Sequence, residues 1–334
     1  MCNRIKHILR FLLKFIIAML LLLVVSFIIY EIVLAVRIEK IANSDDSLYK
    51  NEILSEDMEI HMVDVGQGDG FVVTLKDQVI VIDCGPILHS GAMTKYLKKM
   101  GVKKIDVLIL SHQHQDHFGG LDQIVSNFKV DKIYITEIET KTNMTPFEVF
   151  HYYRCNSTIA TFNMINHYSS VESFKTKKGK LKTESVGEMT ITFIGPVKSY
   201  DDINNNSLVF KLEYKDVSVL FTGDIEKKSE LDLVEEYGDD LKVDILKLPH
   251  HGSHTSSCEE FLAKTDPQIA LISCAIDNDF WHPHKQVAKR LKENGIVLYR
   301  TDEDGDIIIV TDGHEIYSKN NEGDYKCGAQ LSSK

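Results

Sequence analysis

Four side chains that bind metal ions lie close together in the segment SHQHQDHFGG, residues 111–120. They are His112, His114, Asp116 and His117. Imidazole and carboxylate groups are ligands that zinc, manganese and iron take in proteins. Four ligands this close in sequence are difficult to place on one tetrahedral ion, so we expect two adjacent ions. His112 and His114 would face one ion, and Asp116 and His117 would face the other. The simpler alternative is a group of histidines that face solvent or are satisfied by hydrogen bonds.

Two further groups of histidines follow apolar segments later in the chain. LKLPHHGSHTSS contains His250, His251 and His254, and WHPH contains His282 and His284. Together with the first motif, these segments hold eight of the fourteen histidines. Chance placement on a surface explains such a concentration poorly. The pattern therefore indicates one site assembled from separate segments.

A carboxylate ends another apolar segment, VSVLFTGD, at Asp224. An aspartate at the end of a buried strand could bridge two metal ions, which would suit the pair expected above. Taken alone, Asp224 is better explained as the N-cap of the helix expected over residues 227–238.

Short apolar segments rich in β-branched residues predict strands before each of these motifs. The strands are expected over residues 58–65, 70–76, 78–85, 105–111, 132–136, 188–195, 207–214, 217–224, 243–249, 268–274, 296–300 and 306–311. Helices are expected over residues 94–101, 227–238, 258–264 and 284–294. Residues 137–185 are polar and aromatic, carry a basic run from Lys175 to Lys182, and predict an insertion over one face. The pattern as a whole predicts one α/β or α+β domain with two sheets and helices on their outer faces.

The N-terminal segment predicts a membrane anchor. Residues 15–30 carry no charge, and the apolar stretch continues past Glu31 to Val36, which is about the length needed to cross a bilayer as a helix. The basic residues that precede it are Arg4, Lys6, Arg10 and Lys14. The positive-inside rule therefore places residues 1–14 in the cytoplasm and the catalytic domain outside the cell. We expect an uncleaved single-pass anchor over residues 15–36 and a polar linker over residues 37–57; a cleaved signal peptide and a buried core helix are the alternatives.

The charge of the chain argues against a broad grip on nucleic acid. Only two of the 49 acidic residues but six of the 38 basic residues lie in residues 1–40, so the rest is more acidic than the formal charge of −11 suggests. An acidic body repels a phosphate backbone. It does not exclude a metal site that handles one phosphate at a time.

The cysteines show no paired spacing. They are Cys2, Cys84, Cys155, Cys258, Cys274 and Cys327. Although an exported domain could form disulfides, no framework is evident, and we expect none.

These motifs and the strands beside them resemble the metallo-β-lactamase fold superfamily, with the closest resemblance to the hydrolase domain of ComEC-type competence proteins. The segments that carry the resemblance follow the order of that family: DVGQGD (64–69), VIDCG (81–85), SHQHQDHFGG (111–120), NNNSLVF (204–210), LFTGDI (220–225), LKLPHHGSHTS (246–256) and HPH (282–284). The resemblance implies a four-layer αββα sandwich over residues 58–315, with metal ions at one edge of the two sheets. One transmembrane helix would precede this domain, and residues 316–334 would form a C-terminal tail.

The resemblance also implies a ligand set. His112, His114, Asp116 and His117 match ligand positions, Asp224 matches the bridging position, and His250 matches the remaining ligand of the second ion. The choice of His250 over His251 rests on motif position alone. Most members of the superfamily have another histidine before the bridging aspartate, where this chain has Asn204-Asn205-Asn206-Ser207. Either the first ion is weakly held, or an asparagine takes that position.

Other matched positions imply contacts around the ions. The resemblance gives supporting roles to Asp64, Asp83 and His251, with Asp83 orienting the ligand loop. It gives substrate contacts to Asn206, Ser253 and Ser256, although structural capping explains the two serines equally well. Asp116 would also accept a proton, and His282 would donate one to the leaving group.

The function implied is that of a membrane-anchored hydrolase with two divalent ions, zinc or alternatively manganese, that uses a metal-bound hydroxide. We expect a phosphodiesterase or nuclease acting on nucleic acid or on a phosphorylated envelope component, and we expect no protein partner. The lysines of the insertion are the obvious basic surface for a nuclease, although such a run is more often a solvated loop. The rival interpretation is an anchored, non-catalytic binding module with a degenerate metal site.

Overall fold

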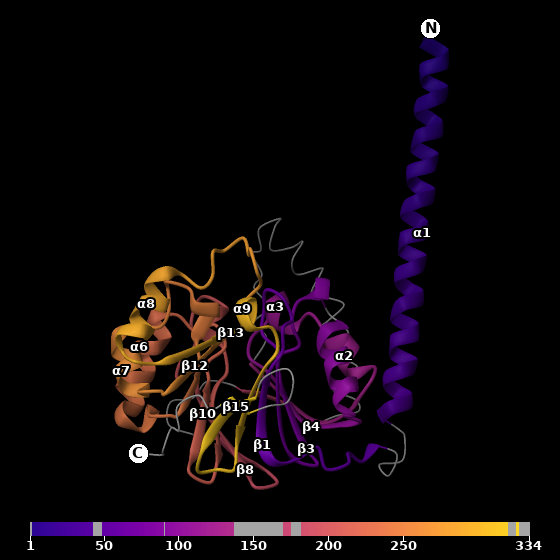
Figure 1. Ribbon diagram of the computed structural model, residues 1–334. Helices are drawn as coiled ribbons and strands as arrows, with labels where there is room; N and C mark the ends of the chain where they lie inside the picture. The colour runs from indigo at the N-terminus through magenta and orange to yellow at the C-terminus, as the bar shows by residue number, and fades with distance from the viewer. Residues whose placement is uncertain are drawn as a thin grey trace.

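The computed structural model describes residues 2–42, 49–89, 91–136, 170–174, 182–319 and 325–326. Two sheets pack face to face, and helices cover both outer faces (Figure 1). The expected four-layer sandwich, preceded by one long apolar helix, is therefore confirmed. Most of the expected insertion, including Lys175, Lys177, Lys178 and Lys180, lies outside the described residues.

The first sheet contains nine strands in the order β16-β15-β14-β1-β2-β3-β4-β5-β6. Their bounds are β1 (Ser55–Met62), β2 (Phe71–Lys76), β3 (Gln78–Ile82), β4 (Lys104–Leu110), β5 (Lys129–Thr136), β6 (Ser170–Phe174), β14 (Ile307–Thr311), β15 (Ile316–Lys319) and β16 (Tyr325–Lys326). β1, β2 and β3 are antiparallel neighbours, whereas β3, β4 and β5 run parallel. β15 and β16 extend this sheet past residue 315, where the domain was expected to end, because Ile316 is buried in the core between the sheets.

The second sheet contains seven strands in the order β13-β12-β11-β10-β9-β8-β7. Their bounds are β7 (Lys182–Val186), β8 (Met189–Gly195), β9 (Val209–Tyr214), β10 (Val217–Phe221), β11 (Ile245–Lys247), β12 (Ile269–Ile272) and β13 (Val297–Arg300). β10 to β13 run parallel to one another. The parallel part of each sheet therefore directs its carboxyl ends, and the loops that follow them, to one edge.

Apolar side chains from both sheets fill the space between them. The ring centroids of Phe210 and Phe221 are 5.1 Å apart, and those of Phe71 and Phe221 are 5.4 Å apart. Phe71 belongs to the first sheet and the other two to the second, so these rings join the two layers. Their burial supplies much of the hydrophobic stabilisation of the fold.

Helices with one apolar face cover the outer sides of the sheets. The helices of the domain are α2 (Gly91–Met100), α3 (Gln115–Phe118), α4 (Leu121–Val125), α6 (Lys227–Tyr237), α7 (Glu259–Thr265), α8 (Lys285–Glu293) and α9 (Thr301–Asp304). In α8, Val287 and Leu291 are buried and are four residues apart, as expected for one face of a helix. Met93 and Leu97 are the equivalent pair in α2.

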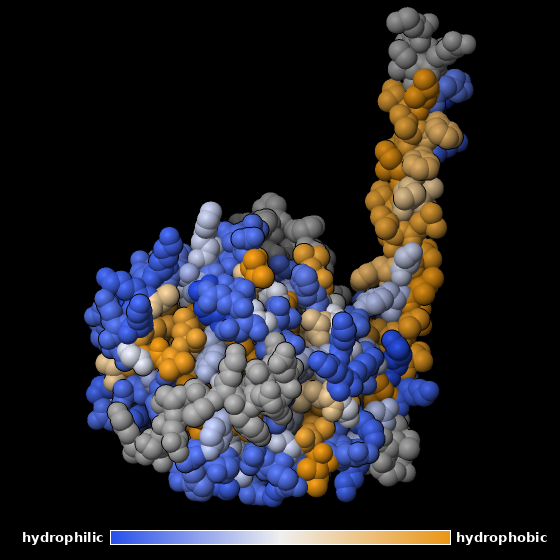
Figure 2. Space-filling model, in the orientation of Figure 1, coloured by the Kyte–Doolittle hydropathy of each residue, from blue (hydrophilic) through white to orange (hydrophobic). Residues whose placement is uncertain are grey.

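α1 (Cys2–Ala42) is long and apolar and projects from the domain (Figure 1). The part from His7 to Ile41 has the length and composition to cross a membrane. The side chains from Ile8 to Ile29 are exposed, which a buried core helix would not show, and Figure 2 shows them as an apolar column. The apolar helix suggests membrane anchoring. It continues beyond Val36, where the anchor was expected to end.

The described cysteine side chains form no disulfide. Cys84, Cys258 and Cys274 are free and buried. The expectation for Cys2, Cys155 and Cys327 falls outside the described side chains.

Asn51 attaches the segment after α1 to the first sheet. Its side-chain amide donates to the carbonyl oxygens of Asp77 and Lys104 at 3.0 and 2.9 Å. Its side-chain oxygen accepts from the backbone N–H groups of Lys103 and Lys104 at 2.9 and 3.0 Å. The side chain is buried, so water is a poor substitute for these four bonds.

We therefore expect Asn51→Ala to lower the free energy of unfolding by about 3 kcal/mol, because it leaves buried backbone groups without partners. The neighbouring side chain Glu52 is exposed, and Glu52→Ala should change the value by less than about 0.5 kcal/mol. Denaturant unfolding of the full chain in detergent, followed by circular dichroism, would measure both. A loss below about 1 kcal/mol for Asn51→Ala would show that the tether is dispensable.

Candidate metal centre

The residues of the motifs converge where the parallel strands of both sheets end. Asp83 follows β3, and α3 with its two ligand candidates follows β4 in the first sheet. Asp224 follows β10 in the second sheet, and the short helix η5 (Pro249–Gly252) follows β11. Carboxyl ends of parallel strands meet at one edge, and this common geometry brings distant segments together.

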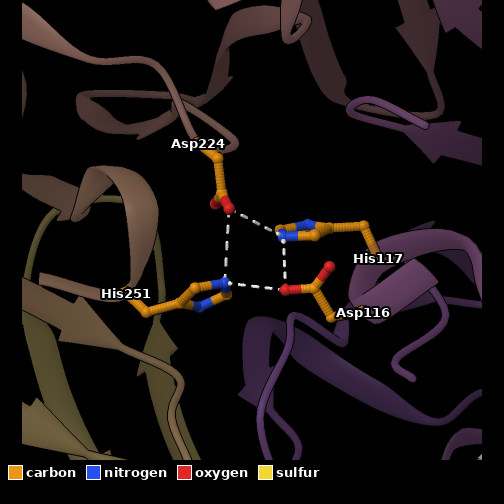
Figure 3. A group of neighbouring side chains, drawn as sticks. All are labelled: Asp116, His117, Asp224 and His251. Carbon is orange, nitrogen blue, oxygen red and sulfur yellow. Dashed lines mark ion pairs between the residues drawn. The ribbon is translucent and has the colours of Figure 1, made fainter. Parts of the chain in front are cut away.

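Four side chains form the centre of this edge: Asp116, His117, Asp224 and His251 (Figure 3). One ligand atom from each lies within 4.8 Å of the others. Nε2 of His117 is 3.2 Å from Oδ2 of Asp224. Nε2 of His251 is 3.4 Å from Oδ2 of Asp224 and 3.4 Å from Oδ2 of Asp116. Two imidazoles and two carboxylates thus point at one another from three segments: α3, the loop after β10, and η5.

Hydrogen bonds to the outer ring nitrogens set the direction of both imidazoles. Nδ1 of His117 donates to Oδ2 of Asp83 at 2.8 Å. Nδ1 of His251 donates to the carbonyl oxygen of Ser273 at 2.8 Å. Asp83 is held in turn by the backbone N–H and the hydroxyl of Ser111, both at 2.7 Å. Each histidine therefore directs Nε2 at the centre, as metal ligands with oriented rings do.

The inward atoms make only ion-pair contacts within the group and have no hydrogen-bond partner in the described part of the chain. They are Nε2 of His112, His117 and His251 and Oδ1 of Asp224, and all are buried. Buried polar atoms are rarely left without a partner in folded proteins. Imidazole nitrogen and carboxylate oxygen are donors for divalent transition metals. The residues present therefore fit metal ions, and their layout fits a dinuclear site.

Opposite charges stabilise each other in this cluster. Burial by itself would lower the pKa of His117 and His251, but Asp224 and neighbouring carboxylates raise the pKa of both well above the ordinary value. Burial by itself would raise the pKa of Asp224, but the two histidines hold it well below its ordinary value. The carboxylates are thus kept ionised, which is the state that a divalent cation requires.

His112 also approaches Asp224, and His114 lies beside His112. Nε2 of His112 is 3.9 Å from Oδ2 of Asp224, and the ring centroids of His112 and His114 are 4.8 Å apart.

The three asparagines at positions 204–206 differ in the hydrogen bonds of their side chains. Asn205 and Asn206 use their amides within the loop and its surroundings, whereas Oδ1 of Asn204 is buried and has no partner in the described part of the chain.

The structure brings His251, and not His250, into the central group. His250 lies nearer the surface, where Nδ1 is 3.4 Å from Oε1 of Glu226 and 3.4 Å from the hydroxyl of Thr255. Both histidines have positive φ angles, 51° and 52°, so the chain turns sharply between them. Their side chains consequently face different surroundings. The geometry favours His251 for the position that motif order gave to His250.

Several expected contact residues serve the loops instead of pointing into the centre. Asp64 accepts a bond from the backbone of Gly66, and Asn206 donates to Tyr200 and Asp202. Ser256 donates to the carbonyl oxygen of Ile225, and Ser253 contacts the hydroxyl of Thr255. These bonds agree with the capping alternative for the serines and leave their substrate contacts as proposals.

His282 lies at the mouth of the centre. Its ring is 5.6 Å from that of His250 and 6.1 Å from that of His251. Burial and the positive charges of His251 and His250 lower the pKa of His282 to about 3. Its imidazole is therefore neutral at pH 7, and donation of a proton to a leaving group requires that bound substrate raise this pKa.

Asp69 and Lys247 are two residues of the centre that the sequence analysis missed. Nδ1 of His251 is 3.4 Å from Oδ1 of Asp69, and Nζ of Lys247 forms a close ion pair with Oδ2 of Asp69. Lys247 is also 3.6 Å from Oδ1 of Asp224. The available signals were the second aspartate of DVGQGD and a lysine inside an apolar strand. Gly68 allows this placement, since a Cβ there would lie 2.1 Å from the carbonyl oxygen of Asp116.

Known proteins are similar to this chain in sequence. A family model described as the metallo-beta-lactamase superfamily matches residues 63–275. ComE operon protein 3 of Bacillus subtilis is 29% identical over 276 residues, covering 76% of this chain and 33% of that protein. Competence protein ComA of Neisseria gonorrhoeae is 28% identical over 261 residues, covering 77% of this chain and 33% of that protein. The chain thus spans about a third of the length of these curated relatives. Igni18, a metallo hydrolase of Ignicoccus hospitalis, superposes with a TM-score of 0.49 at 13% identity, covering 75% of this chain and 98% of that one.

We expect His251→Ala to weaken zinc binding by at least about tenfold, whereas His250→Ala should leave the affinity within about twofold. The reason is that, of these two histidines, His251 is the one that directs a nitrogen at Asp116 and Asp224. Competition with a chromophoric chelator would measure the affinities, and circular dichroism would show that both variants fold. A larger loss for His250→Ala would return the ligand role to that residue.

Proposed function

Because the chain belongs to the metallo-beta-lactamase superfamily, we propose that it is a metal-dependent phosphodiesterase held at a membrane by α1. The observation that carries this proposal is the buried group of Asp116, His117, Asp224 and His251 with its unpartnered inward atoms. A hydrolase with such a centre can act on phosphate esters because their charge suits divalent ions.

We assign the ligands to two ions, zinc or alternatively manganese. The first would be held by His112, His114 and Asp224, with Oδ1 of Asn204 in the position where most of the superfamily has a histidine. The second would be held by Asp116, His117, Asp224 and His251. The unpartnered state of Asn204 supports its part in this assignment. Asp224 is shared in this assignment because Nε2 of His112 and Nε2 of His117 both lie near its Oδ2.

The other groups of the centre have distinct tasks in this proposal. When bound, the ions supply Lewis acidity toward phosphate oxygens and a water nucleophile at neutral pH. Asp116 is the most exposed carboxylate of the central group and is placed to accept a proton from water. Lys247 balances part of the charge on Asp69 and Asp224, so these carboxylates stay in place. His282 at the mouth would donate a hydrogen bond to the leaving group.

The substrate class and the orientation belong to the same proposal. The order of motifs supports a phosphodiesterase over a lactamase, because the motifs resemble those of ComEC-type domains. The basic residues before the apolar helix support a cytoplasmic N-terminus and a domain outside the cell. The rival interpretation, a binding module that holds metal without turnover, is an outcome of the test below.

We expect the full chain, loaded with zinc or manganese, to hydrolyse bis(p-nitrophenyl) phosphate, and a chelator to abolish this activity until metal is restored. Asp116→Ala should lower kcat/KM at least about 100-fold, because it removes both a ligand and the proton acceptor. Asp239→Ala is a matched control, since that side chain is 94% exposed and lies on the outer helix layer. About two bound metals with no turnover of any diester would favour the binding module.

A further inference from the structure

α1 runs past the edge that carries the metal centre and continues beyond it. In Figure 1 the helix ends beside the opposite edge, passes α2, and projects beyond α3. Leu34 and Ile38 pack in the same apolar cluster as residues of α2 and α4. The hydroxyl of Tyr30 donates a hydrogen bond to Asp122, in the first turn of α4. α4 follows α3 after two glycines, and α3 carries Asp116 and His117. α1 therefore leaves the domain at the level of the metal centre.

The part of α1 on the N-terminal side of Tyr30 is long enough to span a bilayer. Residues 11–30 contain a single charge, Lys14, and span about 30 Å at 1.5 Å per residue. A lysine near the end of a span can extend its ammonium group to the interface. Tyrosine favours the interface itself. These features place the near surface of the membrane at about the level of Tyr30.

Large apolar side chains are exposed at the same edge. Within the described part of the domain, the three most exposed ones are Trp281, Leu88 and Ile276, at 83%, 80% and 71%. Leu88 lies in η2 (Ile87–His89) after β3, and the other two lie in the loop between β12 and α8. Both segments follow the carboxyl ends of parallel strands. Figure 2 shows small apolar spots, set among hydrophilic side chains, on the edge past which α1 projects.

This apolar rim adjoins the mouth of the metal centre, because Trp281 directly precedes His282. Exposed apolar side chains grouped at one site mark a surface that contacts a partner or a membrane. Tryptophan is enriched where a protein meets the headgroups of a bilayer. The rim and the exit point of α1 therefore indicate the same plane.

We propose that the mouth of the metal centre rests on the membrane that holds α1, and that the substrate is a phosphodiester carried by a lipid of that membrane. The substrate part rests on the proposed function; the membrane contact does not. Hydrolysis would add water across one P–O ester bond. The water oxygen bonds to phosphorus, the leaving alcohol takes a proton, and a phosphate monoester remains.

The chain contains a single tryptophan, Trp281, so its fluorescence reports on the rim alone. We expect its emission to be quenched at least about twofold when the full chain is reconstituted in phosphatidylcholine vesicles brominated on the acyl chains near the headgroup. Unbrominated vesicles are the reference. Equal emission in both kinds of vesicle would overturn the membrane contact.

A second protein provides the matched control for position. Trp281→Phe combined with Ile53→Trp moves the single tryptophan to the segment just before β1, at the end of that strand away from the metal centre. Ile53 is 64% exposed there. We expect the bromine atoms to leave its emission unchanged. Equal quenching of both proteins would show insertion of the whole domain or unfolding, and it would count against an oriented mouth.

Activity tests the substrate class. With metal bound, the full chain should cleave phosphatidylglycerol in vesicles, and Ile276→Asn combined with Trp281→Asn should lower this rate at least about fivefold. The same double variant should hydrolyse bis(p-nitrophenyl) phosphate within about twofold of the parent rate. Cleavage of the soluble diester or of single-stranded DNA without cleavage of the lipid would overturn the lipid substrate. Failure on every diester would refute the proposed function, and the fluorescence result would still decide the membrane contact.

Discussion

The structure depends on the burial of several carboxylates at the seam between two sheets. Asp69, Asp83 and Asp224 are almost completely buried, and isolated charges of this kind are too costly to keep in a protein interior. Each one is therefore surrounded by donors: Asp83 by Ser111 and His117, and Asp69 and Asp224 by Lys247 and His251. This compensation requires segments from both sheets, so neither half of the domain could form the centre alone. The parallel strand order and the close approach allowed by Gly68 serve the same requirement.

Periodicity and motif order predicted most of the architecture, because buried strands have apolar, β-branched sequences and the motifs follow them directly. The strands before Asp83, His112 and Asp224 and the helices α6, α7 and α8 lie close to where they were expected. The side-chain choices at the centre were less accessible. His250 and His251 are adjacent and chemically identical, and only two successive left-handed residues decide which ring faces inward. Sequence patterns carry little information about such backbone angles.

The residues that were missed show the same limit. Lys247 lies in a strand that reads as apolar, and its charge is explained only by Asp69 and Asp224, which belong to two other segments. Asp64 and Asp69 occur in one short motif, but the turn at residues 66–68 directs Asp64 to the loop and Asp69 to the centre. The polar sequence of β7 predicts part of an irregular insertion, whereas its burial in the structure alternates weakly along a strand. In all three cases, Lys247, the pair Asp64 and Asp69, and β7, the structure is determined by contacts between distant segments, which local sequence patterns do not contain.

The ion pair of Lys247 also bears on how the protein matures. A centre made only of ligands would hold uncompensated charge until metal arrived, and folding would wait for the ion, as it does in small zinc domains. Here Lys247 balances part of the charge on Asp69 and Asp224, and a large apolar core lies between the sheets. If the domain is exported as proposed, the chain would fold first on the far side of the membrane and acquire its ions afterwards. Its maturation would then depend on the metal supply of the compartment where it works and not on that of the compartment where it is made.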